Sequence, residues 1–175
     1  MHEKTITTKA GFHGKLLHVD VLEVELGPGE RATREIIRHP GAAVILAQLD
    51  DGRFVLVRQY RKAIERETLE VVAGTLHRGE DPVVCAHREL HEETGYAARE
   101  LIRLGAVVPA PGYTDERLHM FFARLKPEQG AQQPDADETV SVAYATAAEI
   151  ESMIVDGTIE DAKTLAAWLL YRLRQ

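Results

Sequence analysis

The chain has 175 residues, of which 45% are hydrophobic and 28% charged, a composition that indicates one ordinary folded domain and excludes disordered and collagen-like chains. No apolar run approaches the roughly 18 residues of a membrane helix, and residues 1–15 lack the apolar stretch of a signal peptide, so we expect a cytosolic protein without a membrane partner. The formal net charge of -7 argues against nucleic acid as a partner, and the single cysteine, Cys85, fits a reducing compartment.

The first 38 residues predict a small β extension. Short β-like runs, including LLHVDVLEVEL, are interrupted by turn-forming residues, namely Gly11, Gly14, Gly27, Pro28 and Gly29. Such interruptions favour antiparallel strands joined by turns. We therefore expect an N-terminal β extension at residues 1–38, serving as a dimerisation element, and a main domain at residues 39–175.

The main domain begins with a predicted β hairpin. Residues 42–49 and 53–60 are apolar runs joined around Asp51 and Gly52, a pair typical of tight hairpin turns. The segment LEVVAG, residues 69–74, predicts a short strand after the hairpin. Further strands are expected at residues 104–108, 118–125 and 139–144.

The C-terminal residues 159–173 predict a helix. Its apolar stripe is expected to include Leu165, Leu169 and Leu173, with Trp168 packed beside them. Strands flanked by helices predict a sheet that is covered on its faces, an α/β/α sandwich of the α/β (α+β) class.

Residues 82–94 predict a helix with both ends marked. Asp81 suits the N-cap, Pro82 suits the first helical position, and Gly95 suits the residue after the end.

This helix carries three glutamates that can converge on one region. Since an α-helix turns about 100° per residue, Glu89 and Glu93 lie about 40° apart, and Glu92 lies about 60° from Glu89. Like charges at this spacing repel each other, and a divalent cation would turn the repulsion into attraction. Oxygen ligands without a cysteine cluster indicate Mg²⁺, with Mn²⁺ as a substitute. The alternative, which is the more common one for Glu92 alone, is a solvated acidic face.

Two histidines share the same predicted helix. His87 and His91 have a spacing that can bind zinc, but helical geometry places them about 180° from Glu89 and Glu93. We therefore expect surface or packing histidines rather than ligands of the same metal.

From Gly74 to Tyr96 the chain reads GTLHRGEDPVVCAHRELHEETGY. The spacing of Gly74, Glu80, the run RELHEE and the glycine that follows resembles the Nudix box, the motif of a family of diphosphate hydrolases. Tyr96 departs from the aliphatic residue usual at its position. The resemblance implies a Nudix-like α/β/α sandwich with a mixed sheet.

The resemblance also implies roles for the matched residues. Glu89 and Glu93 would coordinate metal, Glu92 would share in metal or water binding, and Arg88 would orient the carboxylates. The carbonyl of Ala73 would add a metal ligand.

Two further segments resemble the ADP-ribose pyrophosphatase branch of the family. They are VRQYRKA, residues 57–63, followed by LEVVAG, and APGYTDE, residues 110–116, where Ala110 replaces the usual serine. The resemblance implies that the substrate is bound by Arg58, Arg61, Glu70, Pro111 and Gly112. The alternative for the two arginines is a pair of surface cations on an edge strand.

The general base stays open between two candidates. Glu116 lies in the loop that follows Pro111 and Gly112, and Glu138 ends the acidic segment PDADE, where the family often has a glutamate-rich loop. The alternative for Glu138 is a structural place before the strand at residue 139. The branch is usually homodimeric, which implies a homodimer here.

Together these features predict Mg²⁺-dependent hydrolysis of the diphosphate of a nucleoside-diphosphate sugar. ADP-ribose, cut to AMP and ribose 5-phosphate, is the leading substrate. The alternatives are GDP-mannose or another sugar nucleotide, and a non-catalytic Nudix module that senses a nucleotide.

Overall fold

A computed structural model describes residues 2–133 and 139–175. The elements in chain order are β1 (Lys4–His13), β2 (His18–Gly27), β3 (Glu30–Arg38), β4 (Ala42–Gln48), β5 (Phe54–Arg61), β6 (Arg66–Glu70), β7 (Val72–Thr75), α1 (Pro82–Thr94), β8 (Tyr96–Val107), β9 (Leu118–Gln129), β10 (Val140–Ala145), α2 (Ala147–Val155) and α3 (Ala162–Arg172). None of the helices in these ranges is long and apolar enough to cross a bilayer.

The contacts divide the chain into two compact units. The first comprises Met1–Gly41 and Val108–Arg117, and the second comprises Ala42–Val107 and Leu118–Gln175. Each unit is formed by segments that are distant in the sequence, and the membership of residues 108–117 in the first unit could not be read from local composition.

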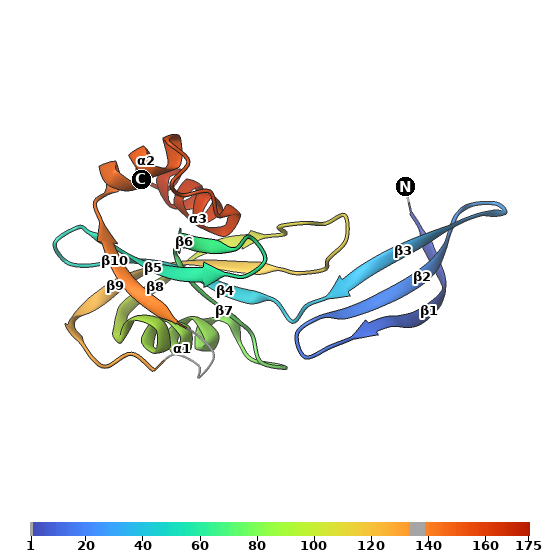
Figure 1. The fold of residues 1–175 in the computed structure, drawn as a ribbon, viewed down its shortest axis with the longest axis horizontal. Coiled ribbons are helices and arrows are strands. Elements are labelled where there is room, and N and C mark those ends of the chain that lie inside the picture. The colour runs from blue at the N-terminus through green and yellow to red at the C-terminus, as the bar shows by residue number, and fades with distance from the viewer. Residues whose placement is uncertain (1, 134–138) are drawn as a thin grey trace. The chain divides into compact units, whose positions relative to one another are not determined.

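The first unit is a three-stranded antiparallel sheet in the order β1-β2-β3, drawn in blue in Figure 1. Every residue of β1 is exposed, whereas Val24 of β2 is 3% exposed. A loop from residues 108–117 joins the end of β3 through a bridge between Ile37 and Thr114. The antiparallel N-terminal extension expected from the sequence is confirmed.

The second unit is built on a seven-stranded mixed sheet in the order β10-β5-β4-β9-β8, with β6 paired to β5 and β7 paired to β4. β4 runs parallel to β9, and the other pairs are antiparallel. The predicted hairpin around Asp51 and Gly52 is confirmed, because β4 and β5 are adjacent and Gly52 adopts a φ of +89° that favours glycine.

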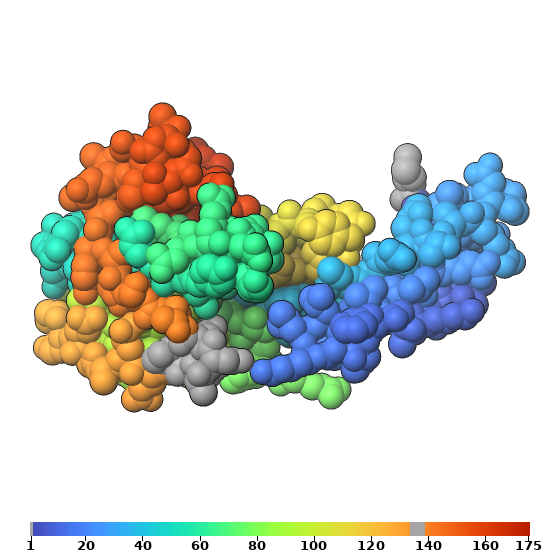
Figure 2. Space-filling view, in the orientation of Figure 1, coloured from blue at the N-terminus to red at the C-terminus, as the bar shows by residue number. Residues whose placement is uncertain are grey.

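Helices cover both faces of this sheet, with α1 on one face and α2 and α3 on the other (Figure 1). Alternate residues of β4 enter different cores. Val44 and Leu46 pack in the core that contains Trp168, whereas Ala43 and Ile45 pack with Leu90 of α1. A continuous apolar strand is therefore buried on both sides, as the α/β/α sandwich predicted. Figure 2 shows α2 and α3, in orange and red, forming one side of this unit.

The C-terminal helix was predicted correctly in position but only partly in its buried face. Trp168 is 6% exposed and its ring meets that of Phe54 edge to face at 5.1 Å, so its expected packing is confirmed. The expected stripe is confirmed at Leu165, which packs against the core, and is wrong at Leu169 and Leu173, which are 58% and 74% exposed. Packing of the large Trp168 ring against the sheet turns the helix so that Ala167, rather than Leu169, is buried.

Two other elements differ from the sequence-based expectation. β8 begins at Tyr96, directly after α1, and is far longer than the strand expected at residues 104–108. Its register with β9 is interrupted at three places, which breaks the simple alternation of apolar residues. α2 was not expected, although Thr146 and Glu149 form the capping box that marks its start.

Candidate active site

The ends of α1 fix the register of its glutamates. The Asp81 carboxylate accepts a hydrogen bond from the Val83 N–H at 2.8 Å, and the Gly95 N–H donates to the His91 carbonyl at 2.8 Å. Gly95 adopts a φ of +73°, and a Cβ there would lie 2.2 Å from the Gly130 carbonyl oxygen. The helix therefore begins and ends where the sequence predicted.

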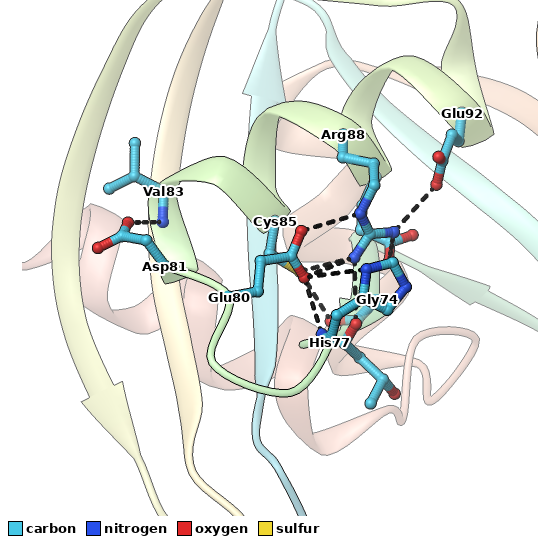
Figure 3. Close-up of polar contacts among 10 residues, drawn as sticks. Gly74, His77, Glu80, Asp81, Val83, Cys85, Arg88 and Glu92 are labelled. Carbon is cyan, nitrogen blue, oxygen red and sulfur yellow. Dashed lines mark hydrogen bonds and ion pairs between the residues drawn. The ribbon is translucent and has the colours of Figure 1, made fainter.

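Arg88 connects the helix to the loop that precedes it (Figure 3). Its Nε and Nη2 donate to the two carboxylate oxygens of Glu80 at 3.0 and 2.9 Å, and Nη1 donates to Glu89 at 2.5 Å and to Glu92 at 3.1 Å. The hydrogen bond from Arg88 lowers the pKa of Glu80 to about 2. The pKa of Arg88 is raised, with the Glu80 hydrogen bond as the main cause, so both groups stay charged at neutral pH.

Gly74 of β7 lies directly against the carboxylate of Glu89. A Cβ built on Gly74 would lie 1.8 Å from the Glu89 carboxyl carbon and 2.0 Å from one of its oxygens. Since atoms cannot approach so closely, glycine is required here for the Glu89 carboxylate to occupy its place.

A cavity of about 270 Å³ lies beside these groups. It is lined by Gln59, Arg61, Ala73, Gly74, Thr75, His77, Arg88, Glu89, Glu92 and Glu93. The three glutamates of α1 therefore face one space, as helical geometry indicated. Glu93 is 5% exposed, whereas the Glu92 side chain is 34% exposed.

The chemistry of this lining fits a hard divalent cation. Carboxylate oxygens and the carbonyl of a residue such as Ala73 are ligands that Mg²⁺ and Mn²⁺ prefer. Arg88 contacts one oxygen of Glu89 and one of Glu92 and supplies positive charge between them. In the described ranges no three acidic, histidine or cysteine side chains stand together as a preformed ligand cluster. The cavity that Glu89, Glu92 and Glu93 line nevertheless leaves room for an ion.

A second group of charges adjoins the cavity. Arg61 donates through Nε and Nη2 to the two oxygens of Glu70 at 2.8 and 2.5 Å, and Lys163 and Thr68 also donate to Glu70. Burial raises the pKa of Glu70, but the Arg61 hydrogen bond and the Lys163 charge outweigh it and lower the pKa to about 2. Glu70 is therefore a carboxylate that is 2% exposed and ionised at neutral pH.

Comparison with known proteins agrees with this geometry. The sequence model of the NUDIX domain matches residues 37–168. The chain belongs to the Nudix family. The cavity beside α1 and β7 lies within the matched residues of this Nudix hydrolase, and divalent-metal dependence is general in this family.

Two relatives match this Nudix hydrolase over almost its whole length, and a third matches most of it. ADP-ribose pyrophosphatase of Bacillus subtilis (strain 168) is 39% identical over 100% of this chain and 95% of its own length. Methanol dehydrogenase activator of Bacillus methanolicus is also 39% identical, over 99% of this chain and 94% of its own. GDP-mannose pyrophosphatase of Escherichia coli O1:K1 / APEC is 32% identical over 77% of this chain and 78% of its own.

A solved structure shares the fold of the Nudix hydrolase. It is described as the crystal structure of ADP compounds hydrolase and superposes with a TM-score of 0.84, covering 98% of this chain and 93% of its own, at 23% identity. The mixed α+β sandwich inferred from the sequence is therefore confirmed as a Nudix fold.

Arg58 and Arg61, which the sequence analysis assigned to the same substrate site, lie on different faces of the sheet. β5 is paired on both sides, so Arg58 does not lie on an edge strand. Because strand residues alternate between faces, Arg61 and Gln59 lie on the α1 face and line the cavity, whereas Arg58 lies on the opposite face. Arg58 is not among the residues of the cavity.

The loop with Pro111, Gly112 and Glu116 belongs to the first unit. Pro111 and Gly112 are exposed, and the Glu116 carboxylate lies 3.6 Å from Nδ1 of His39. Arg38 fixes the loop by donating to Asp115 at 2.9 Å. Glu138, the other candidate base, lies outside the described residues.

Several residues of the site were missed from the sequence. Gln59 could have been found, because it lies two positions from Arg61 and therefore on the same face of a strand. His77 and Thr75 lie between Gly74 and Glu80, where the motif read from the sequence specifies no side chain. Lys163 is 93 positions from Glu70, and no local pattern connects the two.

Proposed function

We propose that this Nudix hydrolase cleaves ADP-ribose to AMP and ribose 5-phosphate with Mg²⁺, and that Mn²⁺ can substitute. The observation that carries the proposal is that Glu89, Glu92 and Glu93 face one cavity that also presents the guanidinium of Arg61. ADP-ribose pyrophosphatases support the choice of substrate: besides the Bacillus subtilis protein, that of Mycobacterium tuberculosis (strain ATCC 25618 / H37Rv) is 30% identical over 95% of this chain.

Each group in the cavity has a proposed task. Glu89, Glu93 and Glu92, with the Ala73 carbonyl, hold the divalent cations, and Arg88 keeps two of the carboxylates in place. When bound, such cations neutralise the diphosphate oxygens and stabilise the charge that develops as water attacks phosphorus.

Substrate binding is assigned to groups around the cavity and in the loop. The planar fork of Arg61 matches diphosphate oxygens, and Glu70 acts by holding that fork. Pro111 and Gly112 remain proposed for the sugar or nucleoside, whereas the position of Arg58 on the opposite face of the sheet argues against a contact between Arg58 and a substrate in this cavity. Glu116 and Glu138 remain the candidates for the general base.

A homodimer in the cytosol completes the proposal. The exposed strand β1 offers backbone and side-chain surface that a second copy can cover, and the buried thiol of Cys85 fits a reducing compartment. Light scattering of the purified protein at several concentrations tests the oligomeric state.

The second candidate substrate is GDP-mannose. It is favoured by the GDP-mannose pyrophosphatase of Escherichia coli, which shares 32% of residues over most of this chain. The same box and metals would serve, because the Nudix box acts on the diphosphate and not on the attached sugar.

Product analysis distinguishes the candidates. The purified protein is incubated with ADP-ribose, GDP-mannose or NADH, with and without Mg²⁺, and the products are separated by chromatography. We expect AMP and ribose 5-phosphate from ADP-ribose as the fastest reaction. Faster hydrolysis of GDP-mannose would replace ADP-ribose as the assigned substrate, and nucleotide binding without Mg²⁺-stimulated turnover would indicate a sensor instead.

The variant Glu93→Gln tests the role of the carboxylates. We expect kcat to fall at least about 100-fold with the fold intact, the magnitude typical of losing a catalytic group. Glu151→Gln, which changes an exposed helix glutamate paired with Arg172, is the matched control and is expected to retain activity. Normal turnover by Glu93→Gln would refute the proposed site.

A further inference from the structure

Lys163 lies where the C-terminal helix meets the charges beside the cavity. It is the second residue of α3, its side chain is 16% exposed, and its Nζ donates to Glu70. Its Nζ also lies 3.0 Å from a carboxylate oxygen of Asp161, the N-cap of α3. A lysine held so closely has lost its side-chain freedom, which costs free energy that its contacts with Glu70 must offset.

Glu70 is fully occupied by protein groups. Arg61 donates to both of its oxygens, and Lys163 and Thr68 add further hydrogen bonds. With its side chain 3% exposed, Glu70 offers no surface that a substrate could contact directly. Glu70 can therefore affect substrate binding only by positioning one of the side chains that donate hydrogen bonds to it.

Arg61 is the partner that reaches the catalytic cavity. It lines the cavity of the three glutamates and also a neighbouring cavity of about 340 Å³ that contains Glu70 and Lys163. The hydrogen bonds to Glu70 use Nε and Nη2. The side of the guanidinium that carries Nε and Nη2 is thus bound to Glu70. Nη1 is then the nitrogen that can donate a hydrogen bond to a phosphate oxygen.

The charges explain why a second cation is needed. An Arg61–Glu70 pair alone would be neutral and would attract an anion weakly. Lys163 shares the Glu70 charge, so the three groups together carry a positive charge. Asp161, which accepts a hydrogen bond from the Thr164 N–H at 3.0 Å, adds one negative charge, so the four groups together are neutral. Without Lys163 the same cluster would carry a net negative charge, which would repel an anionic substrate.

We propose that Lys163 is a positioning residue for substrate binding: it holds Glu70, and through Glu70 it orients Arg61 and preserves the positive charge that Arg61 presents to the diphosphate. This inference rests on the proposed function, because it takes the cavity as the diphosphate site. The C-terminal helix therefore contributes to substrate affinity without contacting the substrate.

The test compares KM and kcat of single and double variants. Lys163→Met is expected to raise KM about fivefold with kcat within twofold, because substrate binding is weakened while the glutamates of α1 are unchanged. Lys163→Arg, which keeps the charge, is expected to restore KM to within twofold. In a Glu70→Gln background, Lys163→Met is expected to change KM less than twofold, since the group through which Lys163 acts is gone.

Lys62→Met is the matched control. Lys62 is 81% exposed, pairs with Glu65 at 2.7 Å and carries the same charge, so its loss changes the net charge without touching Glu70. Its KM is expected to stay within twofold of the wild-type value. If Lys163→Met does not fold, Lys163→Gln replaces it, because glutamine still donates a hydrogen bond but carries no charge.

The outcomes separate this inference from the proposed function. Kinetics are measured with ADP-ribose, or with GDP-mannose if the wild-type protein hydrolyses it faster, so a wrong substrate is seen in the wild-type protein alone. A KM for Lys163→Met within twofold of wild type, or an equal rise of KM in the Glu70→Gln background, would overturn the inference. A fall in thermal stability without a change in KM would also overturn it, because Lys163 would then be purely structural.

Discussion

Adding one methyl group at Gly74 should displace the Glu89 carboxylate. In Gly74→Ala the new Cβ would lie 1.8 Å from the Glu89 carboxyl carbon, whereas ordinary contacts begin at 3.4 Å, so the carboxylate must move by about 1.6 Å. Gly74 does not have a positive φ, so alanine fits its backbone without strain. The clash therefore falls on the Glu89 side chain.

A displacement of this size should greatly reduce catalysis and lower the free energy of unfolding by a moderate amount. Misplacing a reacting group by about 1 Å costs roughly 100-fold, so we expect kcat to fall about 100-fold, with an overpacking cost of about 1–3 kcal/mol in the free energy of unfolding. The assay is steady-state release of AMP from ADP-ribose over a range of Mg²⁺ concentrations, with thermal unfolding followed by circular dichroism.

Two controls make the result specific to Glu89. Gly130→Ala adds the same methyl group where the nearest atom is 3.4 Å away, an ordinary contact, and should keep its activity. In a Glu89→Gln background, Gly74→Ala should reduce kcat by less than about a further threefold, because the Glu89 carboxylate that the new methyl group would displace is already absent. A Gly74→Ala protein with kcat within threefold of wild type would refute the reasoning, since the carboxylate position would then be unimportant.

Two further predictions concern buried ionisable groups. The folded-state pKa of Glu70, about 2, lies below its usual value of 4.5, so its stabilising effect is present above pH 4.5 and is lost as pH falls toward 2. Denaturant unfolding of wild type and Glu70→Gln should therefore show a difference in unfolding free energy that shrinks by about 3 kcal/mol between pH 5 and pH 2, and a difference independent of pH would contradict the assignment. Burial raises the pKa of Cys85 to about 12, so the native protein should resist alkylation by iodoacetamide at pH 8 and react only after unfolding. Rapid labelling of the native protein, measured by mass spectrometry, would show that Cys85 is accessible.

Local sequence was sufficient for the catalytic helix. Asp81 and Gly95 mark its two ends, and the angular spacing of Glu89, Glu92 and Glu93 follows from the helix alone. Their convergence on one cavity could therefore be predicted before any tertiary contact was known. The hairpin of β4 and β5 was equally local, because a turn glycine joins two adjacent apolar runs.

Tertiary structure decided which other side chains join that cavity. The sequence grouped Arg58 with Arg61, but the alternation of β5 places them on opposite faces once the sheet is covered on both sides. The buried face of α3 was set by packing of Trp168 against Phe54, which a hydrophobic stripe alone could not reveal. Lys163 and Glu70 meet only because tertiary packing brings the first turn of α3 to the end of β6.

The sequence by itself determined α1 and the angular positions of its three glutamates. These positions lie within about one or two helical turns, where backbone hydrogen bonds fix the helical geometry. The tertiary structure alone decided the charges around Arg61 and the association of residues 108–117 with the N-terminal sheet. Apart from the pair of Arg61 and Glu70, which are nine positions apart, those contacts join positions tens of residues apart. Their geometry depends on how whole elements pack, which no local spacing encodes.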